Sequence, residues 1–299
     1  MTGIYYKKDL GNGLYSIMEK HLPDAEHGVM MYLVVGEEKA ALVDCGFGVT
    51  DTLRSFVESL TDKPILCIIA HGHPDHAGAA ALFDKIYMNE RDEPLLPVSL
   101  SYERRMDDVF GHGEYDAELK AYCEKHIVMT EKLAYTKMED GNVFDLGGKQ
   151  LEVVAMPGHT QGSVALFNKA ENYALVSDCF SKRTALVKMP KEKRVGITAY
   201  RDGLDRFMNL IDADTKLYWG HGEETVDHAV PADMLKACNE VLEGKVENDQ
   251  PSQSRFAKRP GTDDQRMMEH ICGCVMLDVR PPRRNFPFPF RQPGRVQSS

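Results

Sequence analysis

Short runs of apolar residues, broken by polar ones, dominate the first fifty positions, and this pattern is typical of β-strands. We expect strands in the segments 14–20, 29–36 and 40–45. Residues 51–60 instead place their apolar side chains at helical spacing on one stripe, which predicts an amphipathic helix. Residues 65–70 form an unbroken apolar run rich in isoleucine, so a buried strand is expected there.

Residues 89–140 differ from the segments on either side, because they are charged, favour helix and carry scattered aromatic side chains. We expect a helical insertion in this segment. Two interpretations of it remain open. It can form a layer that packs on the body of the protein, or it can form a lid over a site.

A second series of strands is expected after the insertion, in the segments 142–146, 150–155, 164–168, 174–177 and 216–219. Helices are expected over 200–211 and 231–242. Strands therefore occur in both halves of the chain, with helices after each series. This order predicts an α/β fold in which two sheets pack face to face with helices outside, a four-layer αββα sandwich.

One domain is expected over residues 1–279, with the insertion at 89–140 as a part of it. Residues 267–279 are apolar enough to supply a last strand. Residues 280–299 are rich in proline and arginine, which predicts an extended or disordered tail. The composition of this tail does not define a function.

Charge and cysteine content narrow the class of function. The net charge of -10 at pH 7 argues against general binding of nucleic acid. No apolar stretch has the length of a membrane span, and the first ten residues lack the apolar core of a secretory signal, so we expect a cytoplasmic protein without membrane association. The seven cysteines are odd in number and mostly scattered, which favours reduced thiols. Cys272 and Cys274 are either a redox or metal element or, as their apolar neighbours favour, part of a buried strand.

The segment His71-Gly72-His73-Pro74-Asp75-His76 follows the apolar run at 65–70 directly and holds four side chains that bind metals. It therefore lies where a strand ends and a loop opens, which is the usual location of sites in α/β proteins. Imidazole and carboxylate groups suit zinc, iron and related metals. Three histidines and one aspartate at this spacing predict a metal site.

Three further candidate ligands lie at the ends of expected strands: His159, Asp178 and His221. Each of them is an ordinary loop residue when it is taken alone. Glycines flank both histidines and allow tight turns that direct the side chains. Together with the first cluster they give five histidines and two aspartates, which are enough to hold two metal ions with open positions for water.

These motifs resemble those of the metallo-β-lactamase-fold hydrolase superfamily, and of its glyoxalase II-like members in particular. The resemblance covers roughly residues 10–225 and rests on motifs that occur in the superfamily's order: His71-x-His73-x-Asp75-His76, Gly158-His159-Thr160, Asp178 and His221. It implies the same four-layer αββα architecture.

The resemblance also implies a role for each residue. One metal ion would be bound by His71, His73 and His159. A second ion would be bound by Asp75, His76 and His221, with Asp178 shared between the two. Asp75 and Asp178 would take part in catalysis as ligands that hold the nucleophile. Asp44, which follows an early strand, would orient the ligand loop from behind.

The implied reaction is hydrolysis of a small ester, thioester or lactone by a hydroxide that bridges two divalent metal ions. Zinc is the expected metal, with iron and manganese as alternatives. Two other activities within the superfamily stay open: a mononuclear iron oxidoreductase similar to persulfide dioxygenases, and a phosphodiesterase. A protein that keeps the fold for binding alone is a further alternative, although the intact ligand set argues against it.

Contacts with the substrate are less clearly marked. Lys182 and Arg183 begin a basic segment shortly after Asp178, which would suit an anionic small molecule but also fits a solvated loop. Tyr200 is a candidate because lactonases of the superfamily place a tyrosine near the shared aspartate. His112 lies between two glycines in the insertion and is a last candidate. Neither the identity of the substrate nor the oligomeric state follows from the sequence.

Overall fold

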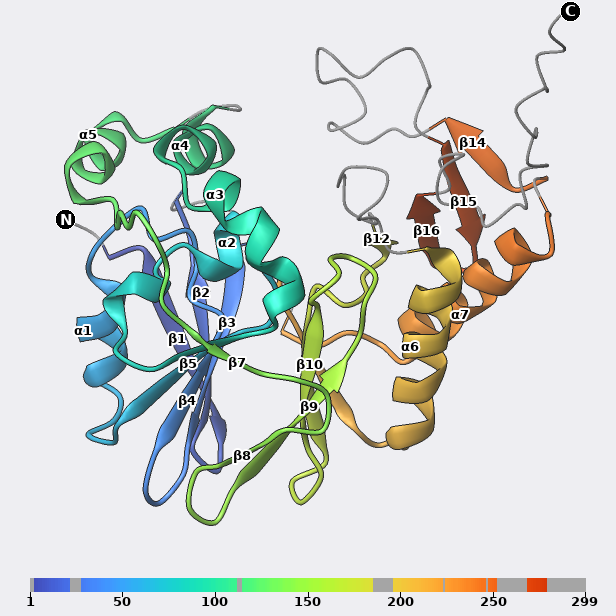
Figure 1. Cartoon of the computed structure of the whole chain (residues 1–299), viewed down its shortest axis with the longest axis horizontal. Coiled ribbons are helices and arrows are strands. Elements are labelled where there is room, and N and C mark those ends of the chain that lie inside the picture. Colours follow the sequence, from blue (N-terminus) through green and yellow to red (C-terminus); the bar gives the residue numbers. More distant parts are fainter. Residues whose placement is uncertain are drawn as a thin grey trace, which may run out of the picture.

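A computed structural model describes residues 3–21, 28–111, 115–184, 196–222, 224–245, 247–251 and 268–278. Its first sheet has seven strands that lie side by side in chain order (Figure 1): β1 (Tyr5–Gly11), β2 (Leu14–Glu19), β3 (Val29–Val35), β4 (Ala40–Val43), β5 (Ile65–Ile69), β6 (Ile86–Met88) and β7 (Thr136–Lys137). The pairs from β1 to β4 are antiparallel, and those from β4 to β7 are parallel.

A second sheet has five strands in the order β13 (Lys216–Trp219), β11 (Tyr173–Ser177), β10 (Val164–Asn168), β9 (Gln150–Ala155) and β8 (Val143–Asp145). Its strands pair antiparallel except for β11 and β13, which run parallel. The parallel pair matters for the site, because both strands end at the same edge of the sheet.

Alternate side chains of β3 show how the two sheets pack. Met30, Tyr32 and Val34 belong to a buried cluster that strands of the second sheet complete. Met31 and Leu33 belong to another cluster, which helices of the first half complete. Successive side chains of a strand point to opposite faces, so one strand separates two cores. A third core fills the space between the second sheet and the late helices, and the expected four-layer αββα architecture is thereby confirmed.

The helices form the two outer layers. Those on the first sheet are α1 (Leu53–Glu58), α2 (Pro74–Ala77), the short 3₁₀-helices η1 (Ala80–Leu82) and η2 (Glu90–Leu95), α3 (Leu96–Ser99), α4 (Tyr102–Phe110) and α5 (Ala117–His126). Those on the second sheet are α6 (Ile197–Leu210) and α7 (Ala229–Leu242). None of the helices in the described residues is long and apolar enough to cross a membrane.

The segment between β6 and β7 is helical, as expected for the insertion. Side chains that accept hydrogen bonds from backbone N–H groups begin its two longer helices: Ser101 before α4, and Asp116 before α5. Met106 and Leu119 belong to the same core as the first sheet. The segment thus packs on the body of the protein, in agreement with the first of its two interpretations. A function as a lid stays a prediction.

The end of the described chain differs from the expected single strand over 267–279. Two strands stand there, β15 (Met268–Cys272) and β16 (Val275–Asp278), and they form a hairpin in a small sheet with β14 (Asp249–Pro251) and β12 (Arg183–Thr184). Gly273 makes the turn with a φ of +54°, which favours glycine. Cys272 is buried and Cys274 is exposed, and all seven cysteines are free thiols. The tail at 280–299 lies outside the described residues.

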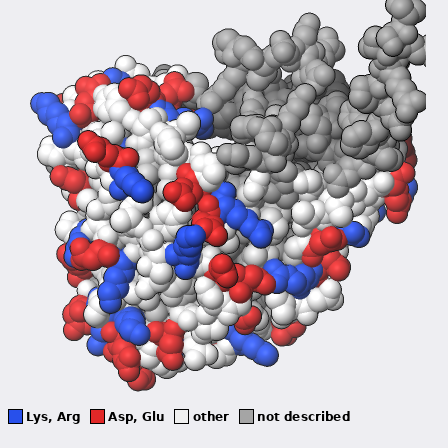
Figure 2. Space-filling view, viewed as in Figure 1, with Lys and Arg blue, Asp and Glu red and all other residues white. Residues whose placement is uncertain are grey.

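Charged side chains of both signs are interspersed over the described part of the face in Figure 2. Such a surface is ordinary for a globular protein of acidic composition. The absence of nucleic-acid binding stays a prediction.

A close backbone approach joins the two sheets at the end opposite the metal ligands. Glu38 and Lys39 donate hydrogen bonds to the carbonyl of Leu146, and a Cβ on Gly36 would lie 2.2 Å from that oxygen. We predict that Gly36→Ala lowers the free energy of unfolding by about 1–3 kcal/mol, because the backbones must move apart. Gly3→Ala, where nothing lies within 4 Å, is the control and should change it by less than about 0.5 kcal/mol. Equal effects in urea titrations would contradict the prediction.

Candidate metal centre

The candidate ligands come from three strand ends, one short helix and one loop, which meet at one edge of the sandwich. His71 follows β5, and His73, Asp75 and His76 lie at or in the first turn of α2. His159 lies in the loop between β9 and β10. Asp178 and His221 follow the parallel strands β11 and β13. Both sheets therefore contribute, and side chains far apart in the sequence are brought together.

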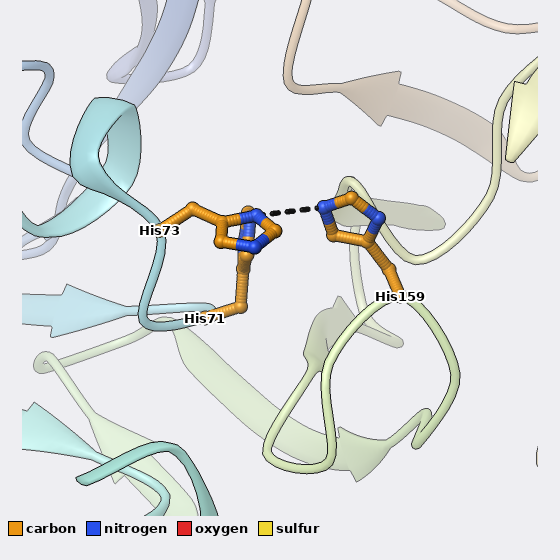
Figure 3. A group of neighbouring side chains, drawn as sticks. All are labelled: His71, His73 and His159. Atoms are coloured by element: carbon orange, nitrogen blue, oxygen red, sulfur yellow. Dashed lines mark hydrogen bonds between the residues drawn. The ribbon is translucent and has the colours of Figure 1, made fainter. Parts of the chain in front are cut away.

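His71, His73 and His159 form the first ligand group (Figure 3). Nδ1 of His73 lies 3.1 Å from Nε2 of His71 and 2.9 Å from Nε2 of His159. Two nitrogens bound to one tetrahedral zinc ion are about 3.3 Å apart, given Zn–N bonds of about 2.0–2.1 Å. Three ring nitrogens that converge in this way fit a shared cation better than a chain of hydrogen bonds.

Asp75, His76 and His221 form the second ligand group. Oδ2 of Asp75 lies 3.4 Å from Nε2 of His76 and 3.3 Å from Nε2 of His221. The two histidine nitrogens are 3.4 Å apart. The three atoms thus form a nearly regular triangle, which again fits a single cation.

Asp178 reaches both groups with one carboxylate oxygen. Its Oδ2 lies 3.1 Å from Nε2 of His221 and 3.6 Å from Nε2 of both His76 and His159. A further set of ligand atoms within 4.8 Å of one another joins Asp178 with His71 and His76. One carboxylate therefore lies between two sets of three ligands.

The charges of these side chains suit metal binding. Burial lowers the pKa of His71 and lowers that of His73 to about 3, so both rings are neutral with a free lone pair. Burial alone would raise the pKa of Asp75 and Asp178, but His76 and His221 hold both well below the usual range. Burial opposes the charged form of His221 as well, yet Asp178 and Asp75 raise its pKa to about 10. The two carboxylates thus produce a negative field that attracts positive charge, whether as protons or as metal ions.

Asp44 supports the second ligand group from behind. It is almost fully buried after β4. Its Oδ2 accepts hydrogen bonds from Nδ1 of His76 at 2.8 Å and from Oγ of Ser177 at 2.7 Å, and its Oδ1 accepts one from the N–H of Ala70 at 2.9 Å. A proton held on Nδ1 leaves Nε2 of His76 free to bind a metal. This contact is the one that the resemblance implies for Asp44.

Asp92 is a buried carboxylate beside the candidate ligands that the sequence does not mark. It lies in η2 of the insertion, and its side chain is fully buried. Its carboxylate accepts hydrogen bonds from the N–H groups of Gly72 and Gly162, at 2.8 and 2.7 Å, and from Oγ1 of Thr160 at 2.6 Å. In the sequence Asp92 stands among Glu90, Arg91 and Glu93, so nothing distinguishes it from the solvated face of a helix.

The four candidate substrate residues are placed differently. Tyr200 is fully buried: its hydroxyl donates to the carbonyl of Cys179, and its ring fills the space that a Cβ on Gly158 would need. It therefore packs beneath the loop of His159, and no part of it is exposed to a substrate. Lys182 is exposed, and its contact with a substrate stays a prediction. The side chain of Arg183, and His112 as a whole, lie outside the described residues.

Comparison with known proteins agrees with this geometry. Residues 25–221 match the model of the metallo-beta-lactamase superfamily, and the chain belongs to this superfamily. The beta-lactamase domain protein from Burkholderia ambifaria has a similar structure, with a TM-score of 0.57 over 80% of this chain and 75% of that one. At 20% sequence identity, this similarity shows the fold alone.

Two curated relatives are enzymes by name. The acyl-coenzyme A thioesterase MBLAC2 of Bos taurus is 24% identical over 223 residues, which are 70% of this chain and 77% of the relative. The hydroxyacylglutathione hydrolase GloC of Haemophilus influenzae is 26% identical over 148 residues, which are 48% of this chain and 61% of the relative. The superfamily and these relatives together make the chain a hydrolase.

The contacts of Asp44 lead to a test. We predict that Asp44→Asn lowers the affinity for zinc by about 10–100-fold, because an amide cannot accept from His76, Ser177 and Ala70 at once. Asparagine tolerates the φ of +63° at this position, so the backbone should be kept. Competition with a chelator measures the affinity. Asp62→Asn, at an exposed position, is the control, and equal affinities in both variants would show that Asp44 does not orient His76.

Proposed function

We propose that the chain is a hydrolase that uses two divalent metal ions, zinc in the first place, to cleave a small thioester, ester or lactone. The observation that carries the proposal is the position of Asp178, whose Oδ2 lies between two sets of three ligands. A single ion would need one such set. Seven buried or partly buried ligands in this arrangement support a site for two.

A thioester is the preferred substrate within this class. The two relatives described above are named as a thioesterase and a hydrolase, and the match to the thioesterase covers 77% of its length. The chemistry is consistent with this choice. A thiol has a pKa near 8.5, so a thiolate leaves readily and needs no general acid to protonate it. An anionic substrate would also find the exposed Lys182 four residues after Asp178.

The side chains of the chain have defined parts in this reaction. Two bound divalent ions would supply a hydroxide near neutral pH and stabilise the negative charge that develops on the attacked carbonyl oxygen. Asp75 and Asp178 are ionised and face the same space, so their carboxylate oxygens can orient the nucleophile by accepting a hydrogen bond from it. Asp44 keeps the proton of His76 on Nδ1, away from the reacting groups. The described residues thus provide position and charge, and a serine or cysteine nucleophile is not required.

Metal content tests the proposal most directly. We predict about two zinc ions per chain in protein purified without chelator or metal-binding tag, as measured by elemental analysis. Removal with a chelator should abolish hydrolysis of thioesters, and added zinc should restore it. About one iron per chain would contradict the proposal and indicate a persulfide dioxygenase-like oxidoreductase instead.

The shared aspartate gives a second test. We predict that Asp178→Ala lowers kcat/KM for a thioester by more than about 100-fold. Substitution of a residue that only supports a metal ligand typically costs about 10–100-fold in activity, and loss of a ligand itself should cost more. The substrate panel holds thioesters, lactones, simple esters and phosphodiesters. Asp205→Ala, at an exposed position of α6, is the matched control and should retain full activity. Unchanged activity of the Asp178 variant would refute the role of a shared ligand.

A further inference from the structure

We infer that the helical segment between β6 and β7 holds the two halves of the metal centre separately, through two buried charged side chains, Asp92 and Arg105. Asp92 positions the first ligand group, and Arg105 positions the second. The inference rests on the proposed site for two metal ions. It assigns to this segment a function other than that of a lid.

Asp92 joins the two loops that carry the first ligand group. Gly72 stands between His71 and His73, and Thr160 follows His159 directly. The carboxylate of Asp92 accepts hydrogen bonds from both of these residues and from Gly162. All three ligands of this group thus lie on loops whose separation is set by one buried carboxylate.

The close approach of Asp92 depends on two glycines. A Cβ on Gly162 would lie 2.7 Å from Cγ of Asp92, and one on Gly72 would lie 3.0 Å from its Cβ. Any larger residue at Gly162 would push the carboxylate away. Without the carboxylate, two N–H groups and one hydroxyl would remain buried without these bonds, which is costly in a protein interior.

Arg105 supports the second ligand group, as Asp92 supports the first. It lies in α4 and is fully buried. The two terminal nitrogens of its guanidinium donate to five backbone carbonyls, at distances of 2.6 to 3.3 Å: those of Phe47, Gly48, Gly78, Leu100 and Val128. Burial lowers the pKa of Arg105 only to about 10, so the side chain stays charged near neutral pH.

Two of the segments that Arg105 contacts lead to the second ligand group. Gly78 caps α2, the helix of Asp75 and His76. Phe47 and Gly48 belong to the loop that begins with Asp44. This loop and α2 are joined by hydrogen bonds from Cys45 to the carbonyl of His76 and from Gly78 to that of Gly46, each 2.9 Å long.

Electrostatics explains why a cation is needed at this junction. Gly48 and Gly78 are in such close contact that a Cβ on Gly48 would lie 2.3 Å from the carbonyl oxygen of Gly78. The carbonyl oxygens of Phe47, Gly48 and Gly78 are therefore crowded together, and the guanidinium offsets their repulsion. The neighbouring peptide group is held as well, because the N–H of Phe47 donates a hydrogen bond to the carboxylate of Glu19 at 2.9 Å.

These contacts predict a selective effect on the two ions. Asp92→Asn should weaken the ion bound by the first ligand group by about 10–100-fold and change the second by less than about threefold. Arg105→Met should have the opposite effect, and Arg105→Lys should restore part of the loss. A role in stability alone would weaken both ions together.

The experiment measures both zinc dissociation constants by chelator competition, and locates the remaining ion by anomalous scattering at the zinc edge in crystals grown with one zinc per chain. Val241→Ala in α7 is the control for general loss of stability, because Val241 is buried in the core of the second sheet. Thr160→Val, which removes one donor to Asp92, replaces Asp92→Asn if that variant does not fold. Arg105→Lys replaces Arg105→Met in the same case.

Selective loss of one ion in each variant, with neither lost selectively in Val241→Ala, is the expected result. Equal weakening of both ions, or selectivity for the opposite half, would overturn the inference and leave the proposed function intact. Binding of fewer than two zinc ions by the unaltered chain would overturn the proposed function itself.

Discussion

A single buried carboxylate, that of Asp44, is the contact on which the arrangement of the metal centre depends. It binds the end of β5 through Ala70, α2 through His76 and the end of β11 through Ser177. Two of these elements, β5 and β11, belong to different sheets, so this carboxylate joins the sheets at the edge that holds the ligands. A buried anion of this kind is stable only when its oxygens are fully bonded. The backbone at Asp44 and at Ser177 accordingly has a positive φ, of 63° and 45°, which non-glycine residues seldom adopt and which the surrounding bonds maintain.

The strands and the ligand clusters could be predicted from the sequence because their signals are local. Apolar runs marked β3, β5 and β10, and ligand chemistry restricted the candidates to histidine and aspartate at the strand ends. Asp92 and Arg105 gave no such signal, because their importance comes from burial against segments distant in the sequence. Tyr200 shows the reverse case. Its distance in sequence from Asp178 made it a candidate for substrate binding, but packing beneath Gly158 places it in the core. The sequence predicts one strand where the hairpin of β15 and β16 stands, since the turn of this hairpin is only two residues long and apolar residues flank it on both sides.

Metal ligands and the residues that position them have different chemical requirements. A ligand must offer a lone pair at a defined point, which only a few side chains do. A supporting residue has only to satisfy buried N–H groups or carbonyls. The chain meets this second need with a carboxylate for N–H groups, at Asp92, and with a guanidinium for carbonyls, at Arg105. The carboxylate of Asp92 is stabilised by the partial positive charge of N–H groups, and the guanidinium of Arg105 by the partial negative charge of carbonyl oxygens. Neither side chain therefore needs an ion pair with a metal ligand.

The ligands are also divided along the chain, and this has a consequence for how the protein matures. Four of them stand before residue 80 and three after residue 158, on different sheets. A ribosome-bound chain that has completed only the first sheet cannot present either candidate ligand group in full, because each group needs a histidine from the second half. At the proposed site, metal binding would therefore follow docking of the two sheets. Metal ions bound there would stabilise the docked state by mass action, because only the docked sheets present both ligand groups in full.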